Sequence, residues 1–128
     1  MQASDLLARE SIKADVYNLR FATSTDEKNL FELIEPYSLV VMVEEGVKKG
    51  GTGESLASLL LENDININFL SLAVPNVFPP AATRDELIHL YRLDGQGIFE
   101  QVLDKWQSYR FKKVLDQVKN DTWEGKKL

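Results

Sequence analysis

The residues best placed to do chemistry lie in one short stretch of the chain, VEEGVKKGGTG, which spans Val43–Gly53. In it the adjacent carboxylates of Glu44 and Glu45 precede glycines at positions 50, 51 and 53. If a strand ends and a helix begins here, the free amides after the glycines can bind an anion such as a phosphate. Two carboxylates can also act as an acid–base pair, and the same residues suit a plain turn.

Spacing argues against the first two of these interpretations. Neither GxGxxG nor GxxxxGK[ST] is present, because Lys48 and Lys49 precede the glycines instead of following them. Neighbouring residues of a strand point to opposite faces, so Glu44 and Glu45 should not face one substrate. We therefore predict a turn in which the glycines provide positive φ angles and close packing. One of the two glutamates is expected to bond the loop amides or to face a partner subunit.

Other candidate sites are weaker. The chain has no cysteine, which excludes disulfides and thiol nucleophiles, and its single histidine, His89, argues against a zinc site. The acidic residues do not have the regular spacing of a calcium-binding loop. We therefore assign no catalytic, cofactor-binding or metal-binding residue to this chain.

Charge divides the chain into two unequal parts. Residues 1–104 carry 8 basic and 17 acidic side chains, net −9, whereas residues 105–128 carry 7 and 3, net +4. An acidic body repels phosphate backbones, which argues against nucleic acid as a partner. We expect the basic tail to fold back onto the acidic body. Apolar runs stay far below the ~20 residues of a membrane span, so no membrane contact and a cytoplasmic location are expected.

Apolar periodicity predicts the elements that must position these residues. A helix is predicted over 2–10, a strand over 14–21, and then a helix that starts at a capping box formed by Ser24 and Glu27. LVVMV at 39–43 is apolar on both faces, which is typical of a parallel strand covered by helices on either side. A helix follows the glycines, and a strand is predicted over 65–74.

The last third of the sequence favours helices. Thr83 and Glu86 form a second capping box, and Asp94 is predicted to cap a further helix. Residues 111–118 continue an amphipathic pattern into the tail. The alternation of helices and strands predicts an α/β fold with a mainly parallel, or mixed, sheet. We divide the chain into a domain of residues 1–107 and a C-terminal amphipathic helix with a basic tail at 108–128.

Three segments resemble a known family: NLRFATSTDEKNL, VVMVEEGVKKGGTGESLASLL and LAVPNVFPPAATRDELIHLYRLDGQGI. Together they are similar to the C-terminal domain of transketolase-like thiamine-diphosphate enzymes, most of all the 1-deoxy-D-xylulose-5-phosphate synthase family. The resemblance runs from about Gln2 to Leu103. Departures include Thr52 in place of a usual aromatic residue and the absence of the family's first strand.

The resemblance implies a three-layer α/β/α domain within an enzyme that condenses pyruvate with glyceraldehyde 3-phosphate, on the route to isoprenoid precursors. The family binds thiamine diphosphate and magnesium through a Gly-Asp-Gly motif in its other domains, and this chain lacks that motif. Glu44, Glu45, Gly50, Gly51 and Gly53 therefore transfer only as a structural or interface segment. The chain alone should be inactive, with the remaining domains and a second copy of itself as partners.

Two alternatives remain open at this point. The first is the C-terminal part of the beta subunit of a 2-oxo-acid dehydrogenase's first component, which shares the strand–Glu–Gly-Gly segment. The second is a stand-alone interaction or anion-binding module that kept the fold.

Overall fold

The structure is a computed structural model that describes residues 2–19 and 26–124. Its elements are, in chain order, α1 (Gln2–Arg9), α2 (Glu27–Ile34), β1 (Leu39–Val47), α3 (Thr52–Glu62), β2 (Asn68–Val74), α4 (Arg84–Leu90) and α5 (Gly95–Glu124).

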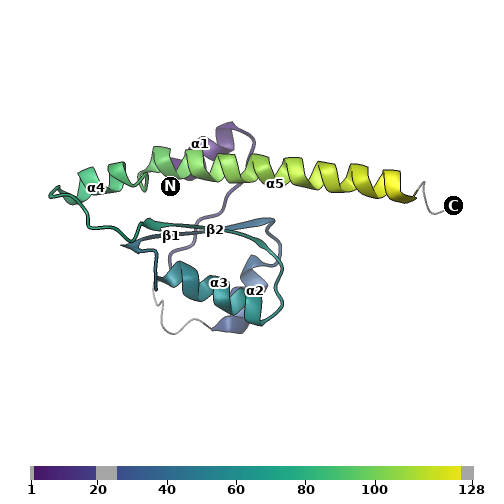
Figure 1. The fold of residues 1–128 in the computed structure, drawn as a ribbon, viewed down its shortest axis with the longest axis horizontal. Helices are drawn as coiled ribbons and strands as arrows, with labels where there is room; N and C mark the ends of the chain where they lie inside the picture. The colour runs from purple at the N-terminus through teal and green to yellow at the C-terminus, as the bar shows by residue number, and fades with distance from the viewer. Residues whose placement is uncertain (1, 20–25, 125–128) are drawn as a thin grey trace.

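The domain has three layers, with a parallel sheet of β1 and β2 in the middle (Figure 1). α1 and α5 cover one face of the sheet, and α2 and α3 cover the other (Figure 1). The pairing runs in register from Leu39 opposite Asn68 to Val43 opposite Leu72, and shifts before Val47 meets Val74. The α/β/α architecture expected from the sequence is therefore confirmed.

Each face of the sheet has its own apolar core, because alternate strand residues point to opposite sides. The core under α1 and α5 is built on Leu7, Leu72, Leu93 and Val102. The core under α2 and α3 is built on Leu30, Ile34, Leu56 and Leu60. Along β1, Leu39 and Val41 pack on the first core and Val40 on the second. This two-sided burial explains why LVVMV is apolar throughout.

The strand predicted over 14–21 is wrong where the structure describes it, because residues 14–19 form no strand. Val16 and Tyr17 are instead exposed, at 64% and 55%. The segment is held to Tyr37, whose hydroxyl donates to Asp15 over 2.6 Å and lies 3.2 Å from the Tyr17 hydroxyl. The hydrogen bond to Asp15 is the largest cause that raises the pKa of Tyr37, and the hydrogen bond to Tyr17 is the second. Strand-forming side chains define a strand only where a partner strand and a covered face are available.

The start of α2 also differs from the prediction. Ser24 lies outside the described residues, and the helix begins at Glu27 with Asp26 as its N-cap. Asp26 Oδ1 accepts from the Asn29 amide over 3.4 Å. The strand predicted over 65–74 is shorter than expected and begins at Asn68, while Ile65 packs into the core under α2 and α3.

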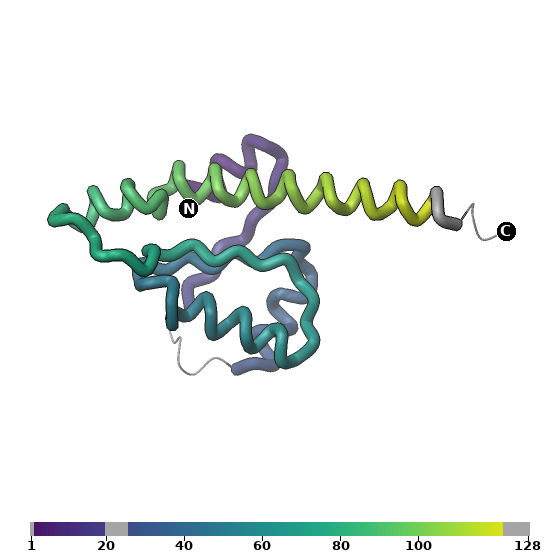
Figure 2. Tube along the Cα trace, in the orientation of Figure 1, coloured from purple at the N-terminus to yellow at the C-terminus, as the bar shows by residue number. Residues whose placement is uncertain are grey.

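The expected folding-back of the basic tail is also wrong over residues 110–121, where the structure describes the side chains. α5 is one uninterrupted helix, and its second half projects past the end of the sheet (Figures 1 and 2). Residues 110–121 are all exposed along this half. The division between residues 107 and 108 falls inside α5 and stays a prediction. Among the helices that the structure describes, none combines the length and apolarity needed to cross a membrane.

Candidate functional site

The first candidate site is the junction of β1 and α3, where Glu44 receives the first amides of the helix. The Thr52 amide donates to Glu44 Oε2 and the Gly53 amide donates to Oε1, each over 2.9 Å. Helix N-termini carry unsatisfied N–H groups and a partial positive charge, both of which favour a carboxylate. Gly51 is the N-cap residue and has no side chain to offer. Glu44 therefore caps α3 from the preceding strand.

The glycines of this junction make the approach of Glu44 geometrically possible. A Cβ atom on Gly51 would lie 2.6 Å from Glu44 Oε1 and 2.8 Å from the Val47 carbonyl oxygen. A Cβ atom on Gly53 would lie 2.3 Å from Ser71 Oγ, on the neighbouring strand β2. Gly50 has φ +72°, a left-handed conformation that glycine adopts without steric cost. Each of the three glycines therefore has a steric or conformational reason to be there.

Ser71 on β2 also lies at this junction. Its Oγ is shielded from solvent and has no hydrogen-bond partner within the part of the chain that the structure describes. It packs against Gly53, where the added Cβ would collide with it. Sequence patterns gave no sign of this contact, because β2 reaches α3 only through the folded sheet.

Glu45 points to a different partner. The Arg84 Nε donates to Glu45 Oε2 over 2.9 Å, and Arg84 Nη2 forms a shorter contact to Oε1. Glu45 raises the pKa of Arg84 through this hydrogen bond. The side chains are 67% exposed for Arg84 and 58% for Glu45, so the pair joins β1 to α4 at the surface. The two glutamates thus face separate groups, which argues against a carboxylate pair acting on one substrate.

The junction does not fit a metal-bridged diphosphate. The amides that would hold a phosphate oxygen already bind the carboxylate of Glu44. Within residues 2–19 and 26–124, no group of three or more His, Cys, Asp and Glu side chains lies together in a way that could hold a metal ion. Diphosphate cofactors need both an amide or cationic cradle and oxygen ligands for the cation.

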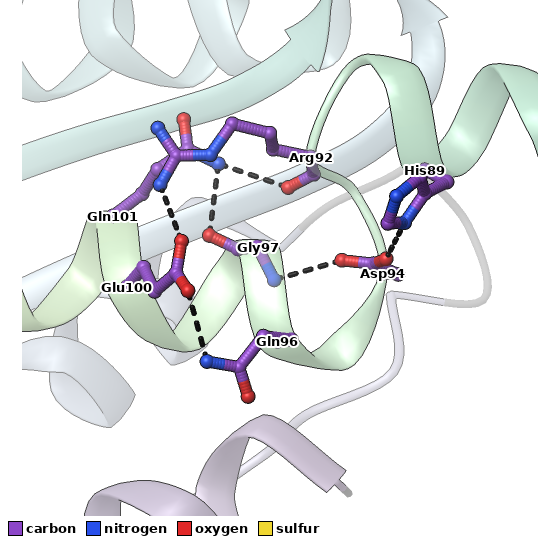
Figure 3. Close-up of polar contacts among 7 residues, drawn as sticks. All are labelled: His89, Arg92, Asp94, Gln96, Gly97, Glu100 and Gln101. Carbon is purple, nitrogen blue, oxygen red and sulfur yellow. Dashed lines mark hydrogen bonds and ion pairs between the residues drawn. The ribbon is translucent and has the colours of Figure 1, made fainter.

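A second polar cluster joins α4 to α5 (Figure 3). Asp94 Oδ1 accepts from the Gly97 amide over 2.7 Å, which confirms Asp94 as a helix cap. Asp94 Oδ2 lies 2.7 Å from His89 Nδ1, and His89 and then the Gly97 amide hold the pKa of Asp94 below its usual range. Arg92 has φ +57°, and Gln101 Nε2 donates to its carbonyl oxygen over 2.9 Å. These contacts fix the turn between the two helices.

The same cluster also contains the ion pair of Arg92 with Glu100 (Figure 3). Arg92 Nη2 donates to Glu100 Oε2 over 2.8 Å, and Gln96 Nε2 donates to Oε1 over 2.9 Å. Gln96 and then Arg92 lower the pKa of Glu100. Sequence reasoning identified the cap at Asp94 but missed the His89, Arg92 and Glu100 contacts. A capping residue preceded by His and Arg within five positions is the signal that could have suggested them.

Comparisons with known proteins agree with this structural description. Residues 1–98 match the family described as "Transketolase, C-terminal domain". The chain is 38% identical over 108 residues to a 1-deoxy-D-xylulose-5-phosphate synthase of Synechococcus sp., covering 84% of the chain and 17% of the relative. Proteins of the same name are 35% identical in Erwinia tasmaniensis and 32% identical in Histophilus somni, over 74% and 73% of the chain. The chain spans 15% of the length of each of these two.

Proposed function

Since this chain belongs to the transketolase C-terminal domain family, we propose that it is the C-terminal assembly domain of a 1-deoxy-D-xylulose-5-phosphate synthase-like enzyme. The complete enzyme condenses pyruvate with glyceraldehyde 3-phosphate and uses thiamine diphosphate and magnesium bound by its other domains. The chain alone is inactive in this proposal. The names of its curated relatives favour this parent over the 2-oxo-acid dehydrogenase alternative.

The observation that carries the proposal is the position of Glu44. A loop that served as a phosphate site would leave its amides open to the ligand. Here the amides of Thr52 and Gly53 are filled by a carboxylate of the same chain. The segment Glu44–Gly53 therefore stabilises the fold of the domain and leaves the amides of Thr52 and Gly53 unavailable to a cofactor. This is the role expected of an assembly domain.

The partners proposed for the chain are the remaining domains of the synthase and a second copy of the chain, without nucleic acid or membrane, in the cytoplasm. Apolar side chains at the carboxyl end of the sheet support an interface there. Val47 is 45% exposed and Val77 is 57% exposed, and Phe78 is fully exposed at 103%. The Lys48 amide donates to the Val74 carbonyl oxygen over 2.8 Å, which keeps the ends of β1 and β2 together. An exposed apolar patch of this kind commonly marks a protein interface.

Three measurements test the proposal. Titrating thiamine diphosphate and magnesium into the purified chain should give no binding heat, and pyruvate should not be consumed. Adding the chain to a synthase that lacks its C-terminal domain should restore the condensation. Heat of cofactor binding, or turnover by the chain alone, would refute the assembly role.

A surface variant makes the reconstitution experiment specific. Phe78→Ser should weaken reconstitution at least about tenfold, as expected for a central apolar anchor. Val16→Ser is the matched control, because Val16 is also an exposed apolar residue, at 64%, but is not part of the proposed interface. It lies before β1, next to Asp15, which contacts Tyr37. Equal loss in both variants would mean that the carboxyl end of the sheet is not the interface.

A further inference from the structure

α5 carries two apolar stripes on different sides of the helix. The first is half-buried or buried against the body and consists of Ile98, Val102, Trp106 and Tyr109. The second, here called the distal stripe, consists of Phe111, Val114 and Leu115, which are 67%, 60% and 41% exposed. At about 100° per residue, the distal stripe lies about half a turn around the helix from the first stripe.

The distal stripe cannot reach the body of its own chain while α5 stays straight. The positions that continue the body-facing line are Lys113, Asp116 and Gln117, all polar and exposed. The second half of the helix also projects past the sheet (Figure 1). A folded-back tail would need a break in a helix that has no proline or glycine after Gly97 until Gly125. The distal stripe is therefore available to another molecule.

Charge indicates what kind of surface the distal stripe fits. On a helical projection, Lys112 and Lys119 border one edge of the stripe, and Arg110 and Asp121 lie near the other. A surface complementary to the lysine edge is apolar with acidic residues beside it. The body of this same chain is strongly acidic, at net −9 over residues 1–104.

The body offers an open cavity of about 350 Å³ with these properties, at the turn between α3 and β2. We call it the α3–β2 groove, and its lining includes Leu60, Leu61, Ile65, Ile67 and Phe69. Leu61 is 80% exposed at its mouth. Asp64 belongs to the lining, and Glu62 is exposed beside Leu61. The groove is thus mainly apolar, with the carboxylate of Asp64 in its lining and Glu62 next to Leu61 in the sequence.

We propose that the distal stripe of one chain docks into the α3–β2 groove of a second copy, and that the second copy returns the same contact. This inference gives a geometry to the self-association proposed above and rests on it. In Figure 1 the projecting half of α5 and the α3–β2 turn lie toward the same end of the molecule, which suits a closed two-fold exchange of helices.

Site-specific crosslinking tests the contact directly, because the chain has no native cysteine. Leu61→Cys and Leu115→Cys are made as separate variants, mixed and oxidised. The mixture should yield at least about tenfold more disulfide-linked dimer than either variant alone. If Leu115→Cys alone links as well as the mixture, two distal stripes pair with each other and the proposal is wrong.

Sedimentation of the pure chain over a range of concentrations provides the second test. The double variant Phe111→Ser with Leu115→Ser should raise the dimer Kd at least about tenfold, and Leu61→Glu should do the same. Lys113→Ala with Gln117→Ala changes the opposite side of the same helix and should leave the Kd unchanged. Circular dichroism checks that each variant keeps its helix content. A wild-type chain that stays monomeric at every concentration overturns the proposal.

These outcomes are separable from those of the proposed function. The sedimentation and crosslinking experiments use the chain alone, whereas reconstitution uses the other part of a synthase. A monomeric chain that still restores the condensation removes the helix exchange and keeps the assembly role. A chain that forms the expected crosslinked dimer but fails to restore the condensation keeps the helix exchange and removes the assembly role.

Discussion

Helices α3 and α4 begin in opposite ways. α4 starts with a local capping box, in which Thr83 accepts from the Glu86 amide over 3.3 Å and Glu86 Oε2 accepts from the Thr83 amide over 2.8 Å. α3 starts with Glu44, which lies eight residues before Thr52 on the preceding strand. The first cap needs only its own turn of helix, whereas the second exists only when strand, glycine loop and helix are already assembled.

The difference also concerns solvent. The Glu44 hydrogen bonds are partly buried, while the Thr83 and Glu86 bonds are exposed. Water can replace a lost acceptor at an exposed helix end, but it replaces one less well where the amide is enclosed. α3 should therefore depend more on its cap than α4 does. Four changes of sequence or pH sharpen or break this comparison.

The largest effect is expected for Glu44→Leu. It leaves the Thr52 and Gly53 amides without an acceptor beside an apolar side chain, which should cost about 2–4 kcal/mol of the free energy of unfolding. Urea denaturation measures the loss. Glu45→Leu is the matched control, since it makes the same chemical change one residue later, at an exposed ion pair. Similar losses of unfolding free energy in the two variants would mean that the non-local cap stabilises the protein no more than an exposed ion pair does.

Gly51→Ala should be next in size. Its Cβ would press on Glu44 Oε1 and on the Val47 carbonyl oxygen, and such overpacking typically costs about 1–3 kcal/mol. Gly46→Ala serves as the control, because a Cβ there meets nothing closer than Glu44 Oε2 at 3.7 Å. Thermal denaturation of both variants gives the comparison. A Gly51→Ala protein as stable as Gly46→Ala would contradict the close approach of Glu44.

Thr83→Ala should cost less, about 1 kcal/mol, as is usual for the loss of a helix cap. Thr83→Ser keeps the hydroxyl and should retain most of the stability. The Thr83 amide and hydroxyl also lower the pKa of Glu86. The midpoint of urea denaturation decides between the variants, and a loss as large as that of Glu44→Leu would erase the distinction between local and non-local caps.

The smallest effect is expected at Asp94, whose partners His89 and Gly97 both lie within five residues of it. Its pKa is lowered in the fold, so its contribution to stability is complete above the ordinary aspartate value of about 3.9 and is lost as pH falls below it. The difference in melting temperature between wild type and Asp94→Asn should therefore shrink below that pH. His89→Ala should reduce the difference, because His89 is the larger cause of the shift. A difference independent of pH would contradict the role of the charge.

The sequence predicted most of the fold where the signal was local or periodic. Thr83 with Glu86, and Asp94, were identified as caps because each bond spans three residues. The strand at 39–43 was identified because both of its faces are covered. The strand over 14–21 was wrong, since side chains such as Val16 indicate a strand only when a partner is present.

The sequence by itself determined that Glu44 and Glu45 point to opposite faces of a strand and that three glycines lie between this strand and the first turn of the following helix. Only the tertiary structure decided that Glu44 turns to the amides of α3 while Glu45 meets Arg84, a residue 39 positions away. It also decided that α5 continues straight, so that its distal stripe faces away from the body. The physical reason is distance along the chain. A hydrogen bond between near neighbours forms within one turn of backbone, whereas a distant partner is brought within reach only by packing of the sheet and helices.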